Sequence, residues 1–153
     1  MADAYVATGN QNAITTDITA LTVLQSGSAT ARGFIDYFSA GVAGDTTMAD
    51  HMQGIVAQRA TTAGTGTAVV PAPLDTAAAV SGLTGTAENH TAEPTYTSAT
   101  ELWDGSIHLR SLLQVHLRRP WVVPSTANAG IGFFLQSNAS ATQLWHFTAE
   151  WEE

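Results

Sequence analysis

The chain of 153 residues contains no cysteine and no lysine. Without cysteine there is no disulfide framework, no thiolate nucleophile, and no zinc or iron–sulfur site built on thiolates. Without lysine there is no amine for Schiff-base chemistry and no phosphate-binding lysine of a P-loop. The length is that of one domain, which can bury a sizeable core without disulfides or metal. These two absences exclude several large classes of enzyme and cofactor site.

Charged side chains are also scarce. They make up 12% of the sequence, about half the share usual in a soluble domain, and 13 acidic residues against 5 arginines give a formal net charge of -8. Nucleic acids and anionic lipids both select clustered basic residues, so we expect neither as a direct partner. Few charges together with abundant Ala, Thr, Ser and Gly is a composition seen in proteins whose surface is covered by copies of themselves or by partners.

Long hydrophobic runs are absent as well. No stretch approaches the 18 or more apolar residues of a membrane span, and Met1 to Tyr5 lack the basic and apolar segments of a signal peptide. We therefore expect no membrane partner. The chain would be made in the cytoplasm without a signal peptide and would leave a cell by lysis or within a particle.

The clearest periodicity that is present is two, the period of a β-strand. Apolar and polar residues alternate from 106 to 118, with Leu112 as the only apolar residue on the polar face. This pattern predicts one long, half-buried antiparallel strand. Asp104-Gly105 is a turn signal ahead of it, and Pro120 is expected to end the strand.

Further β-branched or aromatic runs lie between clusters of turn residues. They predict strands at residues 5–8, 18–24, 33–38, 54–60, 121–123, 131–135 and 144–151. One short helix is predicted over residues 45–52, with Asp45 as its N-cap.

Roughly eight short antiparallel strands with hardly any helix predict an all-β fold, a single jelly-roll β-sandwich. We divide the chain into an extended N-terminal arm, residues 1–16, and the sandwich domain, residues 17–153. Within the domain, residues 61–100 lose all periodicity and predict a long loop carrying one or two short strands. Both aperiodic segments are expected to be mobile alone and to contact a partner.

The histidines do not predict a metal site. His108 and His116 lie on one face of the predicted long strand but roughly 26 Å apart, too far to share a metal. His116 and His146 could be cross-strand neighbours, yet no carboxylate lies close to them in sequence. The His-x-His pair of cupin enzymes and the Gly-x-Ser-x-Gly nucleophile elbow are both missing. We expect no catalytic residue, metal or cofactor, although a spatial pair of carboxylates remains open at this stage.

Aromatic and basic residues are the candidates for an interface. The six that we select are Tyr5, Arg118, Arg119, Trp121, Trp145 and Trp151. The tryptophans could stack on sugars, but the alternation places Trp145 and Trp151 on one face with Phe147, which favours packing in a core or interface. The Arg118-Arg119 pair is either a solvated strand end or a docking point for an acidic neighbour, such as the C-terminal glutamates of another copy.

Several segments occur in a particular order along the chain. They are Ile14-Thr15-Thr16, Ala31-Arg32-Gly33-Phe34-Ile35-Asp36-Tyr37-Phe38, residues 58–67 leading into Pro71-Ala72-Pro73-Leu74-Asp75, Arg118-Arg119-Pro120 with a Trp-Val-Val-Pro strand, residues 131–135, and an aromatic strand ending in glutamates. Their order resembles that of small phage head-decoration (cement, auxiliary) proteins of the jelly-roll type. The resemblance spans most of the chain and is one of pattern, with no catalytic signature.

The resemblance implies a structural virion protein on the outer surface of a phage head. It would sit as a homotrimer at threefold or pseudo-threefold positions, bridge neighbouring major capsid protein subunits and stiffen the shell against the pressure of the packaged DNA. The alternatives are a tail-associated or receptor-binding knob and a carbohydrate-binding module, each with a host glycan as partner. An enzyme ranks last.

Overall fold

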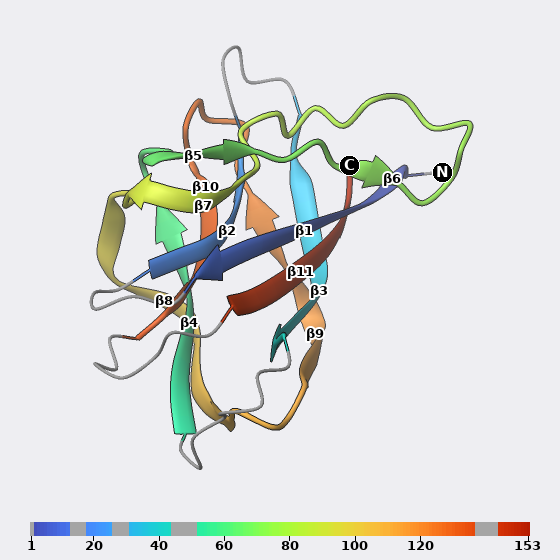
Figure 1. Cartoon of the computed structure of the whole chain (residues 1–153). Coiled ribbons are helices and arrows are strands. Elements are labelled where there is room, and N and C mark those ends of the chain that lie inside the picture. Colours follow the sequence, from blue (N-terminus) through green and yellow to red (C-terminus); the bar gives the residue numbers. More distant parts are fainter. Residues whose placement is uncertain (1, 13–17, 26–30, 44–51, 137–143) are drawn as a thin grey trace.

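Two antiparallel β-sheets pack face to face in the computed structural model, which describes residues 2–12, 18–25, 31–43, 52–136 and 144–153 (Figure 1). The strands of the described residues are β1 (Ala4–Asn12), β2 (Ile18–Leu24), β3 (Gly33–Val42), β4 (Met52–Ala60), β5 (Thr65–Ala68), β6 (Ala72–Pro73), β7 (Ala87–Ala92), β8 (Tyr96–His108), β9 (Leu113–Val123), β10 (Gly130–Leu135) and β11 (Leu144–Glu152). The all-β sandwich predicted from the alternation is confirmed.

The chain alternates between the two sheets. Sheet A has the strand order β6-β1-β11-β3-β9, and sheet B has the order β5-β7-β2-β10-β4-β8. Successive long strands therefore lie in opposite sheets, except that β4 and β8 are neighbours in sheet B. The short strands β5, β6 and β7 all come from the excursion between β4 and β8. Each sheet therefore contains strands from both halves of the sequence.

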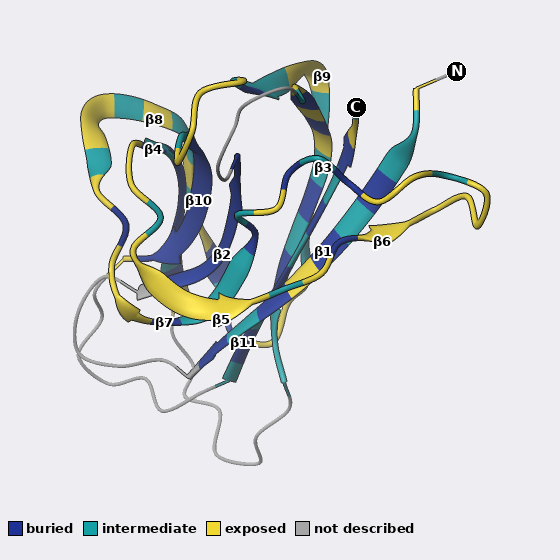
Figure 2. Cartoon of the chain, turned by 90° about the horizontal axis from the view of Figure 1, so that it is seen from above, coloured by how far each residue is buried: buried dark blue, intermediate teal, exposed yellow. Residues whose placement is uncertain are grey.

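The buried residues lie between the sheets (Figure 2). The core that they form is rich in aromatic rings. The predicted alternation in β11 places Trp145, Phe147, Ala149 and Trp151 in this core, each 1% exposed or less. A buried aromatic side chain removes about 150–250 Å² from water, worth roughly 4–6 kcal/mol as an upper estimate. The aromatic face of β11 is therefore a main source of the stability of sheet A.

The strand predicted at residues 5–8 is confirmed and is longer, since β1 covers Ala4–Asn12, so these residues of the predicted N-terminal arm are part of sheet A. β1 pairs with β11 from Ala4 opposite Glu152 to Asn12 opposite Leu144; residues 13–16 lie outside the described residues. Beyond Tyr5 its inward side chains are small or polar: a Cβ on Gly9 would lie 2.5 Å from the Ala20 carbonyl oxygen of β2. Close approach of the two sheets requires such small residues, and they weaken the hydrophobic alternation that marks a strand.

Residues 106–118 form a strand–turn–strand unit and not the single long strand predicted. β8 ends at His108, β9 begins at Leu113, and the Ser111 N–H donates to the His108 carbonyl at 2.8 Å across the turn. In the turn, Leu109 is buried and Leu112 is 65% exposed. The alternation of buried and exposed side chains therefore continues through the turn. Sequence periodicity alone does not distinguish a strand from two strands joined in this way.

The two flanking signals were also misread. Asp104 and Gly105 lie inside β8, and Pro120 lies inside β9. β9 is an edge strand of sheet A, where a missing N–H is tolerated, and its register with β3 shifts between Ile35 and Tyr37. A bulge on an edge strand accommodates the proline without ending the strand.

Residues 61–100 are more ordered than the predicted long loop. β5 pairs with β7, β6 pairs with β1, and β8 begins at Tyr96. Thr, Ala and Gly dominate these strands, so no hydrophobic period marked them. The helix predicted over residues 45–52 lies outside the described residues except for Met52, which begins β4.

Replacing Tyr5 by Ala tests whether β1 is part of the core. Tyr5 is 2% exposed and stacks on Trp151 with ring centroids 6.1 Å apart, so the substitution should lower the free energy of unfolding by about 3–5 kcal/mol in a urea titration. Thr8→Ala, on the exposed face of the same strand, is the control and should change it by less than about 0.5 kcal/mol. Equal, small effects of both substitutions would restore the mobile-arm prediction.

Candidate interaction surface

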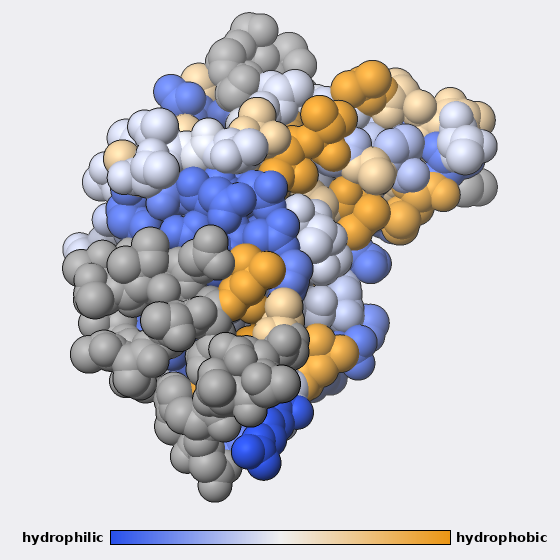
Figure 3. Space-filling view, in the orientation of Figure 1, coloured by the Kyte–Doolittle hydropathy of each residue, from blue (hydrophilic) through white to orange (hydrophobic). Residues whose placement is uncertain are grey.

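An apolar arm projects from the edge of sheet A. It consists of residues 70–80, which include β6, and Figure 1 shows it extending beyond β1 on the side where both chain termini lie. Val70, Leu74 and Val80 are 81%, 57% and 82% exposed. Hydrophobic side chains gather on this side of the molecule in Figure 3. The arm therefore exposes apolar surface to solvent without covering the domain's own core.

The arm is fixed to the domain at both ends. The Leu74 N–H donates to the Ala4 carbonyl at 2.8 Å, and the Tyr5 hydroxyl donates to the Ala79 carbonyl at 2.9 Å. Burial raises the pKa of Tyr5 above 10.0, and the nearby Asp3 and Glu153 carboxylates add to this effect, so the phenol stays protonated as the donor. Between these anchors, the carboxylate of Asp75 accepts from the Ala77 N–H at 2.9 Å, which closes a turn.

The C-terminal Glu153 carboxylate holds the segment that follows the arm. It accepts hydrogen bonds from the Ser81 hydroxyl, from the Gly82 N–H at 2.7 Å and from the Trp151 indole N–H at 3.0 Å. The Leu83 side chain is fully buried in the core beside these contacts. One acidic side chain thus links the chain end to the base of the arm, and charge-assisted bonds of this kind are the stronger ones.

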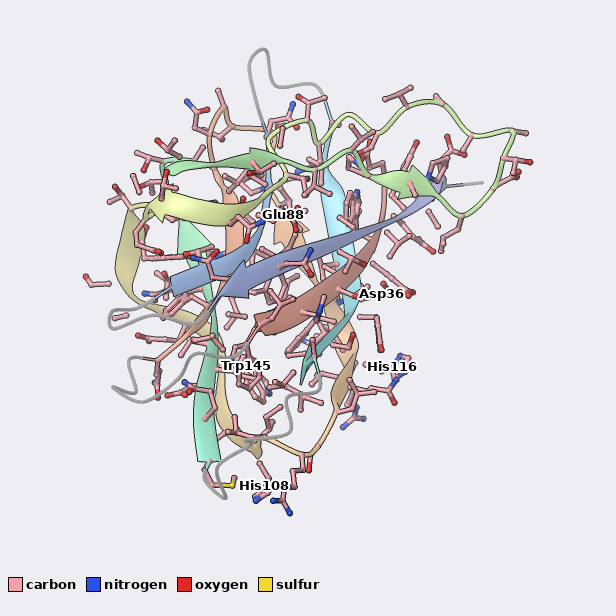
Figure 4. The ribbon with its side chains drawn as sticks, in the orientation of Figure 1. Asp36, Glu88, His108, His116 and Trp145 are labelled. Atoms are coloured by element: carbon pink, nitrogen blue, oxygen red, sulfur yellow. The ribbon has the colours of Figure 1, made fainter. Side chains whose placement is uncertain are left out.

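A hollow of about 320 Å³ lies at the opposite end of sheet A. It is lined by Gly41 and Val42 at the end of β3 and by residues 109–112 of the turn between β8 and β9. His108, just before this turn, lies at the bottom of the view in Figure 4, far from the arm. The hollow is apolar at Val42 and Leu112, and the exposed Arg110 supplies a positive charge at its wall. It is an open depression of a size that one or two side chains can fill.

Three of the six predicted interface residues are core residues. Tyr5, Trp145 and Trp151 are all 2% exposed or less, so this chain's own side chains cover them and they offer no surface to a partner. Their selection as interface residues was wrong, because the aromatic alternation of β11 serves the intramolecular core. Trp121 is half-buried and stacks on Phe38 with ring centroids 5.4 Å apart.

Arg118 and Arg119 are exposed on the edge strand β9. Neither forms an ion pair with another of the described residues, and β3 and β11 separate them from the edge formed by β1 and β6. Glu150 and Glu152 lie on β11, with β3 between that strand and β9. An arginine–glutamate contact of the kind considered from the sequence is therefore open only to two different copies of the chain.

The outer face of sheet A carries a small aromatic and polar cluster. The rings of Tyr37 and His116 are 4.7 Å apart, and the Gln114 side-chain amide donates to the Tyr37 hydroxyl at 3.2 Å. Glu150 lies opposite Tyr37 in the register of β11 and β3. His146 lies on β11, two strands from His116, so the two histidines are not cross-strand neighbours. Among the described residues, no group of three or more His, Cys, Asp or Glu could hold a metal ion.

A buried histidine, which sequence reasoning missed, lies on β7 beside β2. His90 is 5% exposed, its Nδ1 is 3.0 Å from the Thr19 carbonyl oxygen, and its own carbonyl accepts from the Gln11 side-chain amide at 3.2 Å. Burial lowers the pKa of His90 below its ordinary value of 6.5, partly offset by the hydrogen bond to Thr19. No motif surrounds this histidine, because its strand is part of the aperiodic Thr/Ala/Gly-rich region.

Comparisons of the chain with protein-family models, with curated proteins and with solved structures found no match. The described residues contain no helix long and apolar enough to cross a membrane. The geometry of the arm, the hollow and the two faces of the sandwich is therefore the basis for a function.

The Glu153 contacts predict that its side chain orders the base of the arm. Replacing Glu153 by Ala should raise the amide hydrogen-exchange rates of Gly82 and Leu83 by about tenfold or more, the effect of a lost charge-assisted hydrogen bond. Glu152→Ala, at the exposed neighbouring position, is the matched control and should leave both rates unchanged. Equal rates in the two variants would show that the carboxylate of Glu153 does not hold this segment.

The burial of His90 predicts a loss of stability in mild acid. Because its pKa is lower in the folded chain, the unfolded chain takes up the proton first as the pH falls below 6.5, and the free energy of unfolding drops by up to about 1.4 kcal/mol per pH unit. Urea titrations between pH 7.5 and 5.0 measure this slope. His90→Gln should make it shallower, whereas His116→Gln, on the exposed outer face, should keep the wild-type slope; identical slopes in all three proteins would contradict the assignment.

Proposed function

We propose that this chain is a structural virion protein that binds the outside of a phage capsid as a homotrimer and stabilises the shell. The observation that carries the proposal is the anchored apolar arm. Three large apolar side chains, Val70, Leu74 and Val80, face solvent on a segment held at both ends by hydrogen bonds. Clustered exposed apolar residues of this kind are typical of surfaces that contact another protein.

The anchoring of the arm favours assembly over a transient contact. A flexible apolar tail loses conformational entropy when it binds, whereas the turn at Asp75 and the bonds at Leu74 and Ala79 hold the arm before a partner arrives. The surface is also poor in charge, since the whole chain has only 18 Asp, Glu, Lys and Arg residues (13 acidic and 5 basic). Low charge lowers the cost of removing water from a contact surface.

The strand order supports the jelly-roll form of the sandwich. The order β1-β11-β3-β9 in sheet A faces β2-β10-β4-β8 in sheet B, and the remaining short strands are additions at the edges. This alternation between sheets is the pattern of two Greek keys, as in the jelly rolls of viral capsid domains. Because proteins of many functions share this fold, the strand order supports a virion protein only together with the apolar arm.

The edge strand β9 is the surface that we assign to the major capsid protein. It is 11 residues long and carries the exposed Arg118 and Arg119 beside Pro120. Basic residues and a proline prevent two identical edges from pairing with each other. A capsid strand with acidic side chains can still pair with the edge through backbone hydrogen bonds. This contact would fasten each copy to the shell without any catalytic chemistry.

A second candidate function is the binding of a host glycan by a tail-associated or receptor-binding module. The observation that favours it is the cluster of Tyr37, His116 and Gln114 on the outer face of sheet A. An aromatic ring with amide and carboxylate groups beside it is a combination that can stack on a sugar and bind its hydroxyls.

The proposal predicts the mass of the oligomer and the protection of phage heads against rupture. Sedimentation of the purified protein should give about three times the 16.0 kDa chain mass, and phage heads lacking the protein should rupture at lower temperature or milder osmotic shock until the protein is added back. The double variant Leu74→Asp, Val80→Asp should protect these heads at least about tenfold less effectively, because it places charge on the arm.

The matched control is Thr76→Asp, which adds charge at an exposed polar position of the same arm and should protect normally. Full protection by the Leu74→Asp, Val80→Asp variant would remove the basis of the proposal. Binding of the wild-type protein to host surface glycans with no binding to heads would favour the second candidate instead.

A further inference from the structure

Two apolar features of the described residues, the arm and the hollow, lie at opposite ends of sheet A. The Leu74 N–H of the arm is bonded to the Ala4 carbonyl of β1. In the strand register, Ala4 lies opposite Glu152 on β11, and Glu152 lies opposite Phe34 on β3. The hollow contains Gly41, seven residues further along β3, about 23 Å away at the rise of a strand. Figure 1 shows the arm on the side of the chain termini, away from the end of β3.

The arm cannot fill the hollow of its own chain. Leu74 is bonded to Ala4, and the Ala79 carbonyl is bonded to Tyr5. Six residues, 74–79, run from one anchor to the other, so the tip of this loop lies no more than roughly 10 Å from the anchors. A gap of about 23 Å therefore excludes an intramolecular contact, and only another molecule can bring an arm to this hollow.

The arm and the hollow are complementary in chemistry. The arm presents the apolar Leu74 next to the acidic, exposed Asp75. The hollow presents the apolar Val42 and Leu112 next to the basic, exposed Arg110. Its volume of about 320 Å³ is enough for a leucine side chain and part of its neighbour. Each feature thus pairs one apolar group with one charge, and the two charges are opposite in sign.

We propose that the arm of one copy docks into the hollow of the next copy, with Leu74 against Leu112 and Asp75 paired with Arg110. This inference rests on the proposed homotrimer and names the contact that builds it. Because the two surfaces differ, the contact is heterologous, and three such contacts related by a threefold rotation close a ring in which every arm and every hollow is occupied. In this ring, sheet A of each copy extends from the contact at its own arm to the contact at its own hollow.

The absence of cysteine makes a direct test possible. The variant with Leu74→Cys and Leu112→Cys should form disulfides between copies under mild oxidation, giving a covalent trimer on a non-reducing gel. A disulfide requires Cα atoms within about 7 Å, so the 23 Å separation within one chain excludes an intramolecular bond. Mixing the two single-cysteine variants should give a covalent dimer that contains one chain of each kind. The control variant, with Leu74→Cys and Ser125→Cys, places the second cysteine at another exposed position and should give no such trimer.

Charge exchange tests the polar half of the contact without cysteine. Asp75→Arg and Arg110→Asp alone should each raise the trimer dissociation constant by about tenfold, and the two together should return it to within about threefold of wild type. Arg119→Asp on the edge strand is the control and should leave it unchanged. If Arg119→Asp weakens the trimer and Arg110→Asp does not, contact between the arginine pair and the acidic strand of another copy replaces the proposed one.

The results separate this inference from the proposed function. A trimer by sedimentation that forms no disulfide between positions 74 and 112 overturns the arm-to-hollow contact and leaves the decoration proposal standing. A monomer at micromolar concentration overturns both. Circular dichroism and thermal unfolding of each variant verify the fold, since all six substituted side chains, at positions 74, 75, 110, 112, 119 and 125, are exposed.

Discussion

The pairing of the first strand with the last is the interaction on which the rest of the structure depends. β1 and β11 run side by side over nine residue pairs, from Ala4–Glu152 to Asn12–Leu144. The inward face of this pair supplies Tyr5 and Trp151 to the core, and its end supplies the anchors of the arm. Because the ladder joins the two ends of the sequence, sheet A cannot form until nearly the whole chain is available.

The same strand pair also ties the two sheets together at the other end of β1. Glu88 on β7 accepts hydrogen bonds from the Asn10 backbone and side chain at 2.7 and 2.9 Å. The carbonyl of His90 accepts from Gln11 one residue further along. Polar contacts between the sheets at this edge need close approach, which the small residues of β1 permit. Compactness at β1 therefore explains both the buried histidine and the weak sequence signal of the strand.

Sequence reasoning predicted those strands whose own side-chain pattern determines which residues are buried. The alternation of β11 and the turn-bounded apolar run of β10 are such cases, and both strands lie where the pattern placed them. It was incomplete where the decisive partner is distant: a strand was predicted only at residues 5–8, whereas β1 continues to Asn12 along β11, and the turn before Leu113 is invisible to a period of two. The arm and the hollow had no sequence signature, because exposure of Leu74 or Leu112 is a property of the fold. Phage origin, trimer and capsid contact remain proposals.

Exposed apolar surface normally carries a risk of open-ended aggregation, and the placement of each feature here limits that risk. The arm contains Pro71 and Pro73, which cannot donate to a ladder, so it does not extend sheet A by recruiting free strands. The edge strand β9 carries Arg118 and Arg119, whose like charges oppose the pairing of two identical edges. Among the described residues, the arm and the hollow then offer one complementary pair of apolar surfaces per chain. A heterologous contact gives a finite assembly when its rotation closes into a ring, and a ring that uses all its pairs leaves the charged edges free to contact a different protein.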